Sequence, residues 1–189
     1  FFEDLIHWQW PEAPPPGLLV DQDIGPEDVY LPRPLPPNID QTFQKACIDA
    51  DTFAAMGLLL LRYTGMRIGE MIDLSLNAME CVELNRYTLR VPIGKTRSER
   101  LIPLDARTVA LIQRIRAQRA CRRKGGVPAR FAHYLMVSAF GHHMEQQNYS
   151  AAIRQLTAHI NTTEHIHCHR LRHTFATEMA RAGMPVPAL

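Results

Sequence analysis

The stretch that decides the fold lies near the end of the chain and reads His165-Ile166-His167-Cys168-His169-Arg170-Leu171-Arg172-His173-Thr174-Phe175-Ala176-Thr177. On a helix that begins at about His169, Leu171 and Phe175 lie four residues apart and form a buried stripe. His169, Arg172 and His173 lie on another face, in the first turn, where unpaired backbone N–H groups and the helix dipole favour an anion. This first turn is therefore a predicted phosphate-binding site.

The histidines have three alternative roles, because they can be satisfied inside a core, belong to a surface charge cluster or bind a metal ion. For zinc, His169 and His173 lie one helical turn apart, with His165, His167 or Cys168 as a third ligand. No fitting carboxylate or second thiol lies close in the sequence. Phosphate is therefore the preferred ligand, and we expect no metal and no cofactor.

Two further segments carry polar residues at characteristic spacings: Tyr63-Thr64-Gly65-Met66-Arg67-Ile68-Gly69-Glu70-Met71 and Ile93-Gly94-Lys95-Thr96-Arg97-Ser98-Glu99-Arg100-Leu101-Ile102-Pro103-Leu104. The first resembles the T-G-x-R-x-x-E segment of the tyrosine recombinase (phage integrase) family, and the second resembles its lysine hairpin. Residues 169–177 resemble the H-x-L-R-H-x-F-A-T box of the same family. The three segments occur in the family's order, and the resemblance covers about residues 35–189.

The resemblance implies roles for particular residues. Arg67 and Arg172 are the two phosphate-binding arginines, and His169 works beside them. Lys95 is the hairpin lysine, and Glu70 matches an acidic position close to the first arginine. Glu70 also lies three residues after Arg67 on a predicted helix, so it can hold that side chain in place or form a plain surface ion pair.

The expected supporting and DNA-contacting residues complete this set. His173 is expected to support the site, and DNA contacts are expected from Arg97, Arg100 and Arg170.

These residue types suit a particular chemistry. Two guanidinium forks can stabilise the charge that develops on a phosphodiester attacked in line, without any metal. A lysine can give a proton to the departing 5′ oxygen, and a histidine can move the proton of the nucleophile. In the family, a tyrosine then becomes joined to the 3′ phosphate, which preserves the bond for rejoining.

The tyrosine nucleophile is where the sequence departs from the family pattern. All five tyrosines lie before residue 169, and we do not assign Tyr149 as the nucleophile merely because it is the nearest. The family's nucleophile, and a further histidine or tryptophan before it, are expected beyond Leu189. We therefore expect this chain alone to be inactive in DNA cleavage and joining.

Length and composition are consistent with one domain and its core. The chain has 189 residues, 46% of them hydrophobic, and the longest apolar run, Phe53 to Leu61, is too short to span a bilayer. No signal peptide is recognised, and four widely spaced cysteines favour reduced thiols. We expect a cytoplasmic protein without a membrane partner.

Charge and proline content divide the chain. Residues 1–52 contain ten acids and two bases, a net charge of −8, whereas residues 53–189 carry +10. This basic body favours a polyanion partner. Nine prolines between positions 11 and 37 predict an extended linker. We expect residues 1–37 to be this linker, with the end of a DNA-clamping domain at 1–10, and residues 38–189 to be a catalytic domain that lacks its C-terminal end.

Hydrophobic periodicity predicts a mixed, mainly α fold with a small antiparallel β-sheet. The predicted elements are a helix capped by Asn38 or Asp40, a helix from a cap at Asp49 or Asp51 to Thr64-Gly65, helices over 67–74, 106–123, 146–160 and 169–182, and strands over 79–84, 87–93 and 100–104.

The expected function is site-specific DNA recombination or integration through a 3′-phosphotyrosine intermediate. Two alternatives remain open, namely a non-catalytic DNA-binding module derived from a recombinase and a related DNA topoisomerase. The expected partner is double-stranded DNA, on which a longer protein would assemble as a tetramer, while this chain alone would be monomeric.

Overall fold

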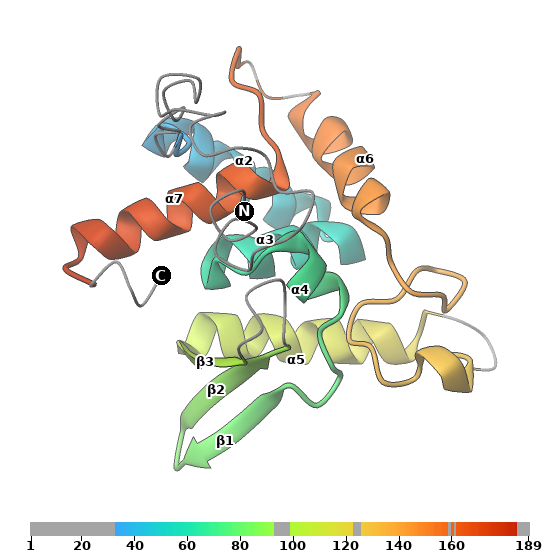
Figure 1. Ribbon diagram of the computed structural model, residues 1–189. Helices are drawn as coiled ribbons and strands as arrows, with labels where there is room; N and C mark the ends of the chain where they lie inside the picture. The colour runs from blue at the N-terminus through green and yellow to red at the C-terminus, as the bar shows by residue number, and fades with distance from the viewer. Residues whose placement is uncertain (1–32, 93–98, 123–125, 159, 161, 185–189) are drawn as a thin grey trace, which may run out of the picture. The chain divides into compact units, whose positions relative to one another are not determined.

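The computed structural model describes residues 33–92, 99–122, 126–158, 160 and 162–184, which all lie in a compact unit that begins at Pro32. The described part is mainly α-helical with one three-stranded antiparallel sheet, which confirms the predicted fold class (Figure 1). Its elements are α2 (Pro37–Ala50), α3 (Phe53–Thr64), α4 (Ile68–Ile72), β1 (Met79–Glu83), β2 (Arg86–Val91), β3 (Arg100–Leu104), α5 (Ala106–Ala120), a 3₁₀ turn (Ala129–Phe131), α6 (Gln146–Thr157) and α7 (Cys168–Arg181).

Helix α3 is the centre of the core. Its sequence is apolar nearly all round, and it packs against α2, α5, α6 and α7. The hydroxyl of Thr52 accepts a hydrogen bond from the N–H of Ala55 at 3.2 Å and so caps the first turn. At the other end, Gly65 adopts a left-handed conformation with φ of 62°, as the sequence predicts for a stop signal.

The predicted N-terminal caps of α2 and α3 are wrong. Asp51 has a left-handed backbone conformation and ends α2, so Thr52 takes the cap position of α3. Pro36 is the N-cap residue, and Pro37 takes the first position of α2, where proline fixes a suitable φ and no amide hydrogen is needed. Asp40 lies one turn inside α2, where it is buried against Arg62 from α3.

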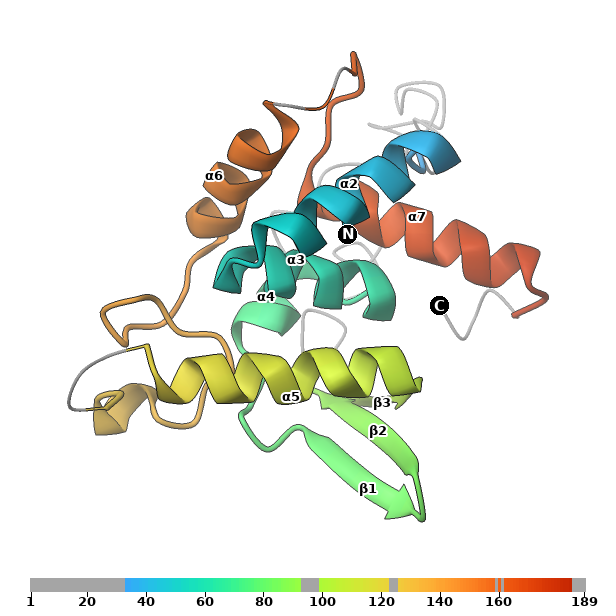
Figure 2. The same ribbon diagram turned by 180° about the vertical axis from the view of Figure 1, so that it is seen from behind.

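The three strands pair in chain order, β1-β2-β3. In the view of Figure 2, α5 lies in front of β3, while β2 and β1 extend below it. Met79 lies opposite Leu89, and Leu89 lies opposite Ile102, so one apolar row faces the core. Arg100, the first residue of β3, pairs with Val91 on this inner face. The register thereby directs a charged side chain towards the domain interior.

Helix α5 buries Val109, Ile112 and Ile115, as predicted. Its arginines, which the sequence places on the remaining surface, make several contacts within the protein. Arg116 donates to the carbonyl of Leu76, and Arg119 donates to the carbonyls of Ala132 and Tyr134. Arg107 lies over the ring of Tyr63, and Arg122, which follows the end of the helix, lies over the ring of Phe53. Several of these arginine side chains therefore bind other segments of the same domain.

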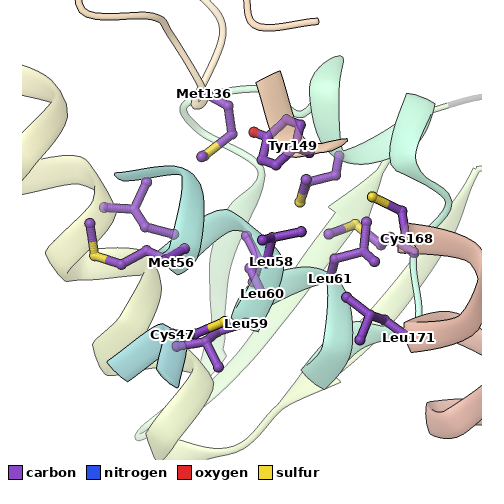
Figure 3. Close-up of a cluster of buried hydrophobic side chains, with 14 of the residues drawn as sticks. Cys47, Met56, Leu58, Leu59, Leu60, Leu61, Met136, Tyr149, Cys168 and Leu171 are labelled. Atoms are coloured by element: carbon purple, nitrogen blue, oxygen red, sulfur yellow. The ribbon is translucent and has the colours of Figure 1, made fainter. Parts of the chain in front are cut away.

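Tyr149 belongs to the hydrophobic core. Figure 3 shows its ring among the aliphatic and sulfur-containing side chains around α3. A β-carbon at Gly57 would come within 2.8 Å of this ring, so the glycine makes room for it. The hydroxyl contacts the sulfur of Met144 at 3.6 Å, and burial raises the pKa of Tyr149 well above its usual value. A fully buried, protonated phenol is unsuited to attack DNA.

Candidate active site

A cavity of about 610 Å³ lies where α4, the start of α7 and the start of α6 meet. The sequence predicts that four catalytic residues converge, and Arg67, His169 and Arg172 all line this cavity. Glu70 lines it as well, whereas Lys95 and Arg97 lie outside the described residues. The other lining residues are Met66, Ile68, Gly69, Asp73, Pro92, Gln146, Ser150, His167 and Cys168.

Arg67 is positioned by the turn that joins α3 to α4. It is the N-cap residue of α4, and its backbone N–H donates to Glu70 Oε2 at 2.7 Å. Its guanidinium donates from Nη1 to Glu70 Oε1 at 3.0 Å. The Arg67 side chain remains 39% exposed. Glu70 therefore fixes both the backbone and the side chain of Arg67 while leaving the side chain accessible.

Glu70 is held by a second arginine from the sheet. Arg100 donates from Nη1 and Nη2 to the two carboxylate oxygens at 2.9 and 2.7 Å. Burial opposes ionisation of Glu70, but the hydrogen bonds from Arg100 and Arg67 outweigh it and lower its pKa to about 2. The carboxylate is therefore ionised at neutral pH, and Arg100, predicted as a DNA contact, is paired with it.

Arg172 reaches the same cavity from α7. It donates from Nη1 to the carbonyl of Gly65, just before α4. Burial, together with the charges of Arg67 and Arg100, lowers the pKa of Arg172. A guanidinium nevertheless stays protonated in proteins. The three guanidinium groups thus outnumber the carboxylates of Glu70 and Asp73 at the site, which leaves an excess of positive charge suited to an anion.

Gly65 joins the segments that carry the two arginines. Besides its bond to Arg172, the position packs directly against the ring of Phe175 on α7. Phe175 lies three residues after Arg172, so the aromatic contact and the hydrogen bond hold α7 and the α3–α4 turn in one register. Gly65 thus connects the α3–α4 turn to α7, two segments that lie more than a hundred residues apart in the sequence.

The histidines of α7 form a pair beside the arginines. The rings of His169 and His173 meet edge to face with centroids 4.3 Å apart. Burial lowers the pKa of His173, and the neighbouring His169 and Arg172 lower it further. His169 is exposed and lines the cavity, where it can exchange a proton with a bound group. Within the described ranges, no three His, Cys, Asp or Glu side chains are grouped to hold a metal ion.

Arg170, the other predicted DNA contact on α7, is engaged within the protein. It donates to the carbonyls of Arg33, Pro34 and His165 and pairs with Glu164 at 2.5 Å. Its side chain is only 13% exposed. The predicted DNA contact stays a prediction, and the observed contacts give Arg170 a structural role between α7 and the segment before α2.

From the sequence alone, Gln146 and Ser150 have no role, His167 has only an alternative role as a zinc ligand, and Arg100 has a DNA contact instead of a place beside Glu70. His167, Gln146 and Ser150 line the cavity, and Arg100 is the second partner of Glu70. The Arg67–Glu70 pair follows from a three-residue helical spacing. The partnership of Arg100 with Glu70 spans thirty residues and depends on sheet register, which leaves no local signal in the sequence.

Residues 37–189 match the phage integrase family, and the chain belongs to this family. This match confirms the family that the fold and the arginine site indicate.

Two of its curated relatives are tyrosine recombinases. The tyrosine recombinase XerD of Pseudomonas putida is 27% identical over 173 residues, which cover 88% of this chain and 56% of that protein. The tyrosine recombinase XerC of Pelobacter propionicus is 31% identical over 126 residues, which cover 67% of this chain and 38% of that protein. The chain spans about half the length of the curated relatives it matches.

Solved structures share the fold. The XerA recombinase is 25% identical with a TM-score of 0.66, covering 88% of this chain and 56% of that one. The Tn1549 transposon integrase, solved in complex with circular intermediate DNA, is 24% identical with a TM-score of 0.66. That match covers 90% of this chain and 59% of the integrase.

No helix among the described residues is both long and apolar enough to cross a membrane.

Proposed function

We propose that this chain forms the core of the catalytic domain of a site-specific tyrosine recombinase, which cuts and rejoins double-stranded DNA through a 3′-phosphotyrosine intermediate. The observation that carries the proposal is the placement of Arg67 and Arg172, from two distant segments, on one cavity with His169. Membership of the phage integrase family and the recombinases among its relatives support the same function.

In this proposal, Arg67 and Arg172 bind the non-bridging oxygens of the scissile phosphate. Their charge stabilises the pentacovalent transition state more than the ground state, because the phosphate oxygens gain negative charge during attack. Glu70 holds Arg67 in position, and His169 moves a proton at the nucleophile or at the phosphate. His173 supports His169 through the contact of their rings.

Two further parts of the reaction are proposed from the family alone. Lys95 would protonate the departing 5′ oxygen. Among the described residues, no tyrosine lines the cavity, so the nucleophile would come from outside these residues. The protein that acts would assemble as a tetramer on DNA in the cytoplasm, whereas the chain alone would be a monomer.

A binding experiment tests the phosphate site. The 189-residue chain is expected to bind duplex DNA with an affinity that falls steeply as salt rises, because each neutralised phosphate releases counterions. Arg67→Met and Arg172→Met are each expected to weaken binding, and the double variant should reduce the salt slope by about one unit, because both arginines contact the same phosphate. A salt slope near zero for the unmodified chain would contradict the proposed site.

A trapping experiment tests the chemistry. The chain alone is expected to form no covalent adduct with a nicked suicide substrate, and an adduct through Tyr149 would contradict the core position of that residue. In any longer protein that contains this chain and exchanges strands, Arg172→Ala should slow cleavage by about 100-fold or more. Supercoil relaxation without site-specific joining would favour a topoisomerase, and DNA binding without either activity would favour a binding module.

A further inference from the structure

Glu70 lies at the centre of a filled hydrogen-bond arrangement. Its side chain is 2% exposed, and its two oxygens accept four hydrogen bonds. Oε1 accepts from Nη1 of Arg67 and Nη1 of Arg100, and Oε2 accepts from the Arg67 backbone and Nη2 of Arg100. Because both buried oxygens are fully hydrogen-bonded, the Glu70 carboxylate is fixed in this position.

The two arginines use this carboxylate differently. Arg100 gives both terminal nitrogens, one to each oxygen, which is the bidentate arrangement that a planar guanidinium fork makes with a carboxylate. Arg67 gives one terminal nitrogen and its backbone N–H. Both guanidinium groups would compete for the bidentate position if either were unconstrained, because that geometry is the strongest that the carboxylate can offer.

We propose that Arg100 is a positioning residue that keeps Arg67 accessible to a phosphate. By occupying the bidentate position on Glu70, Arg100 prevents Arg67 from turning its own fork onto the same carboxylate. Arg67 is then held through a single terminal nitrogen and stays accessible at the cavity. This inference rests on the proposed function, because it concerns the same phosphate site, and it gives Arg100 a role other than the predicted DNA contact.

The physical consequence of losing Arg100 follows from the burial of Glu70. Its two oxygens would each lose one donor, which is costly for a buried charge. Arg67 is the neighbouring cation already in contact, so its fork would rotate to make a bidentate pair with Glu70. The carboxylate would then compete with phosphate for Arg67. Arg172 would remain at the cavity, but a phosphate would be gripped by one arginine instead of two.

The test uses two variants of Arg100 and one matched control in the 189-residue chain. Arg100→Met removes the fork, and Arg100→Lys keeps the charge without the bidentate geometry. The control is Arg90→Met on β2, because Arg90 also makes a bidentate pair, with Glu80 at 2.9 and 3.1 Å, and carries the same charge. Binding of inorganic sulfate by calorimetry and rotation of the Arg67 guanidinium by ¹⁵N NMR are measured for each variant.

We expect Arg100→Met to weaken sulfate binding by about tenfold or more, and Arg90→Met by less than about twofold. Rotation of the Arg67 guanidinium should slow in Arg100→Met, because a bidentate pair restrains both terminal nitrogens. A merely structural loosening would make that rotation faster. Arg100→Lys should change both measurements in the same direction as Arg100→Met, and it carries the test if the methionine variant does not fold.

Four outcomes would overturn the inference. Full restoration of sulfate affinity and of Arg67 rotation in Arg100→Lys would show that charge alone matters. Faster rotation of Arg67 in Arg100→Met would show a loss of structure only. Equal affinities for the unmodified chain and Arg100→Met would overturn this inference but leave the proposed function standing, whereas an unmodified chain that binds no sulfate would contradict both.

Discussion

Position 65 requires glycine for two separate reasons. Its φ of 62° is a left-handed conformation that costs other residues roughly 1–2 kcal/mol. A β-carbon at this position would also overlap the ring of Phe175. The contact that joins the two arginine-bearing segments therefore depends on the absence of a side chain.

Gly65→Ala is expected to lower the free energy of unfolding by about 2–4 kcal/mol, from backbone strain together with overpacking. Urea denaturation measures the change. Gly69→Ala is the matched control, because a β-carbon at Gly69 in α4 has no heavy atom within 4 Å. That variant should be neutral or more stable by up to about 1 kcal/mol, and equal losses in the two variants would contradict the argument.

Glu70 should make stability depend on pH in the acid range. Its pKa is about 2 in the folded chain, against 4.5 ordinarily. The unfolded chain therefore binds the proton first as the pH falls. The contribution is fully present above about pH 5 and is lost as the pH approaches 2. At 1.36 kcal/mol for each unit of pKa, it amounts to roughly 3 kcal/mol.

Glu70→Gln is expected to cost about 3 kcal/mol of unfolding free energy at pH 7 and much less at pH 3, because the native carboxylate loses its own contribution at acid pH. Urea denaturation of both proteins at the two pH values gives the comparison. A difference between the two proteins that stays constant from pH 7 to pH 3 would refute the assignment.

At the scale of elements, a buried ion cluster joins three helices. Arg62 on α3 makes a bidentate pair with Asp40 on α2 at 2.9 and 2.8 Å, and it contacts Glu178 on α7 at 2.7 Å. The side chains of Arg62 and Asp40 are 4% and 5% exposed, whereas that of Glu178 is 50% exposed. Burial opposes the charge of Arg62, but the hydrogen bonds that Arg62 donates to Asp40 and Glu178 outweigh it and raise the pKa of Arg62.

Arg62→Met is expected to cost about 3–5 kcal/mol of unfolding free energy, because it leaves the Asp40 carboxylate buried without its charged partner. Glu178→Gln should cost less than about 1 kcal/mol, since water screens that half of the cluster. Chemical denaturation of both variants tests the ranking. Losses within about 1 kcal/mol of each other would show that the buried pair contributes little.

Sequence periodicity predicts where helices and strands lie more accurately than it predicts the residues at which they begin. The strands, the run in α3 and the buried stripe of α5 follow from alternation or helical spacing, which local side chains determine. The caps depend on which neighbouring residue reaches the free N–H groups, and Thr52 does so where an aspartate was expected. The same distinction holds for the site. Sequence motifs predict Arg67, His169 and Arg172 as site residues, whereas the position of Arg100 beside Glu70 depends on strand register.

At the scale of the whole molecule, the segment before α2 is attached to α7. The N–H of Leu35 donates to Thr174 Oγ1 at 2.9 Å, and Arg170 donates to the carbonyls of Arg33 and Pro34. Leu35 is 3% exposed. These contacts lie before residue 38, the predicted start of the catalytic domain, so residues 33–35 contribute to the packing of the helix that carries Arg172.

The attachment of residues 33–35 decides where this domain can be excised as a portable module. Urea denaturation of two shortened versions, one that starts at Pro32 and one that starts at Asn38, makes the comparison. The version that starts at Asn38 should lose about 2–3 kcal/mol, mainly because the burial of Leu35 is gone. Equal stability of the two shortened versions would place the boundary at residue 38 after all. A designer who grafts this module onto a DNA-binding unit would therefore make the junction before Arg33.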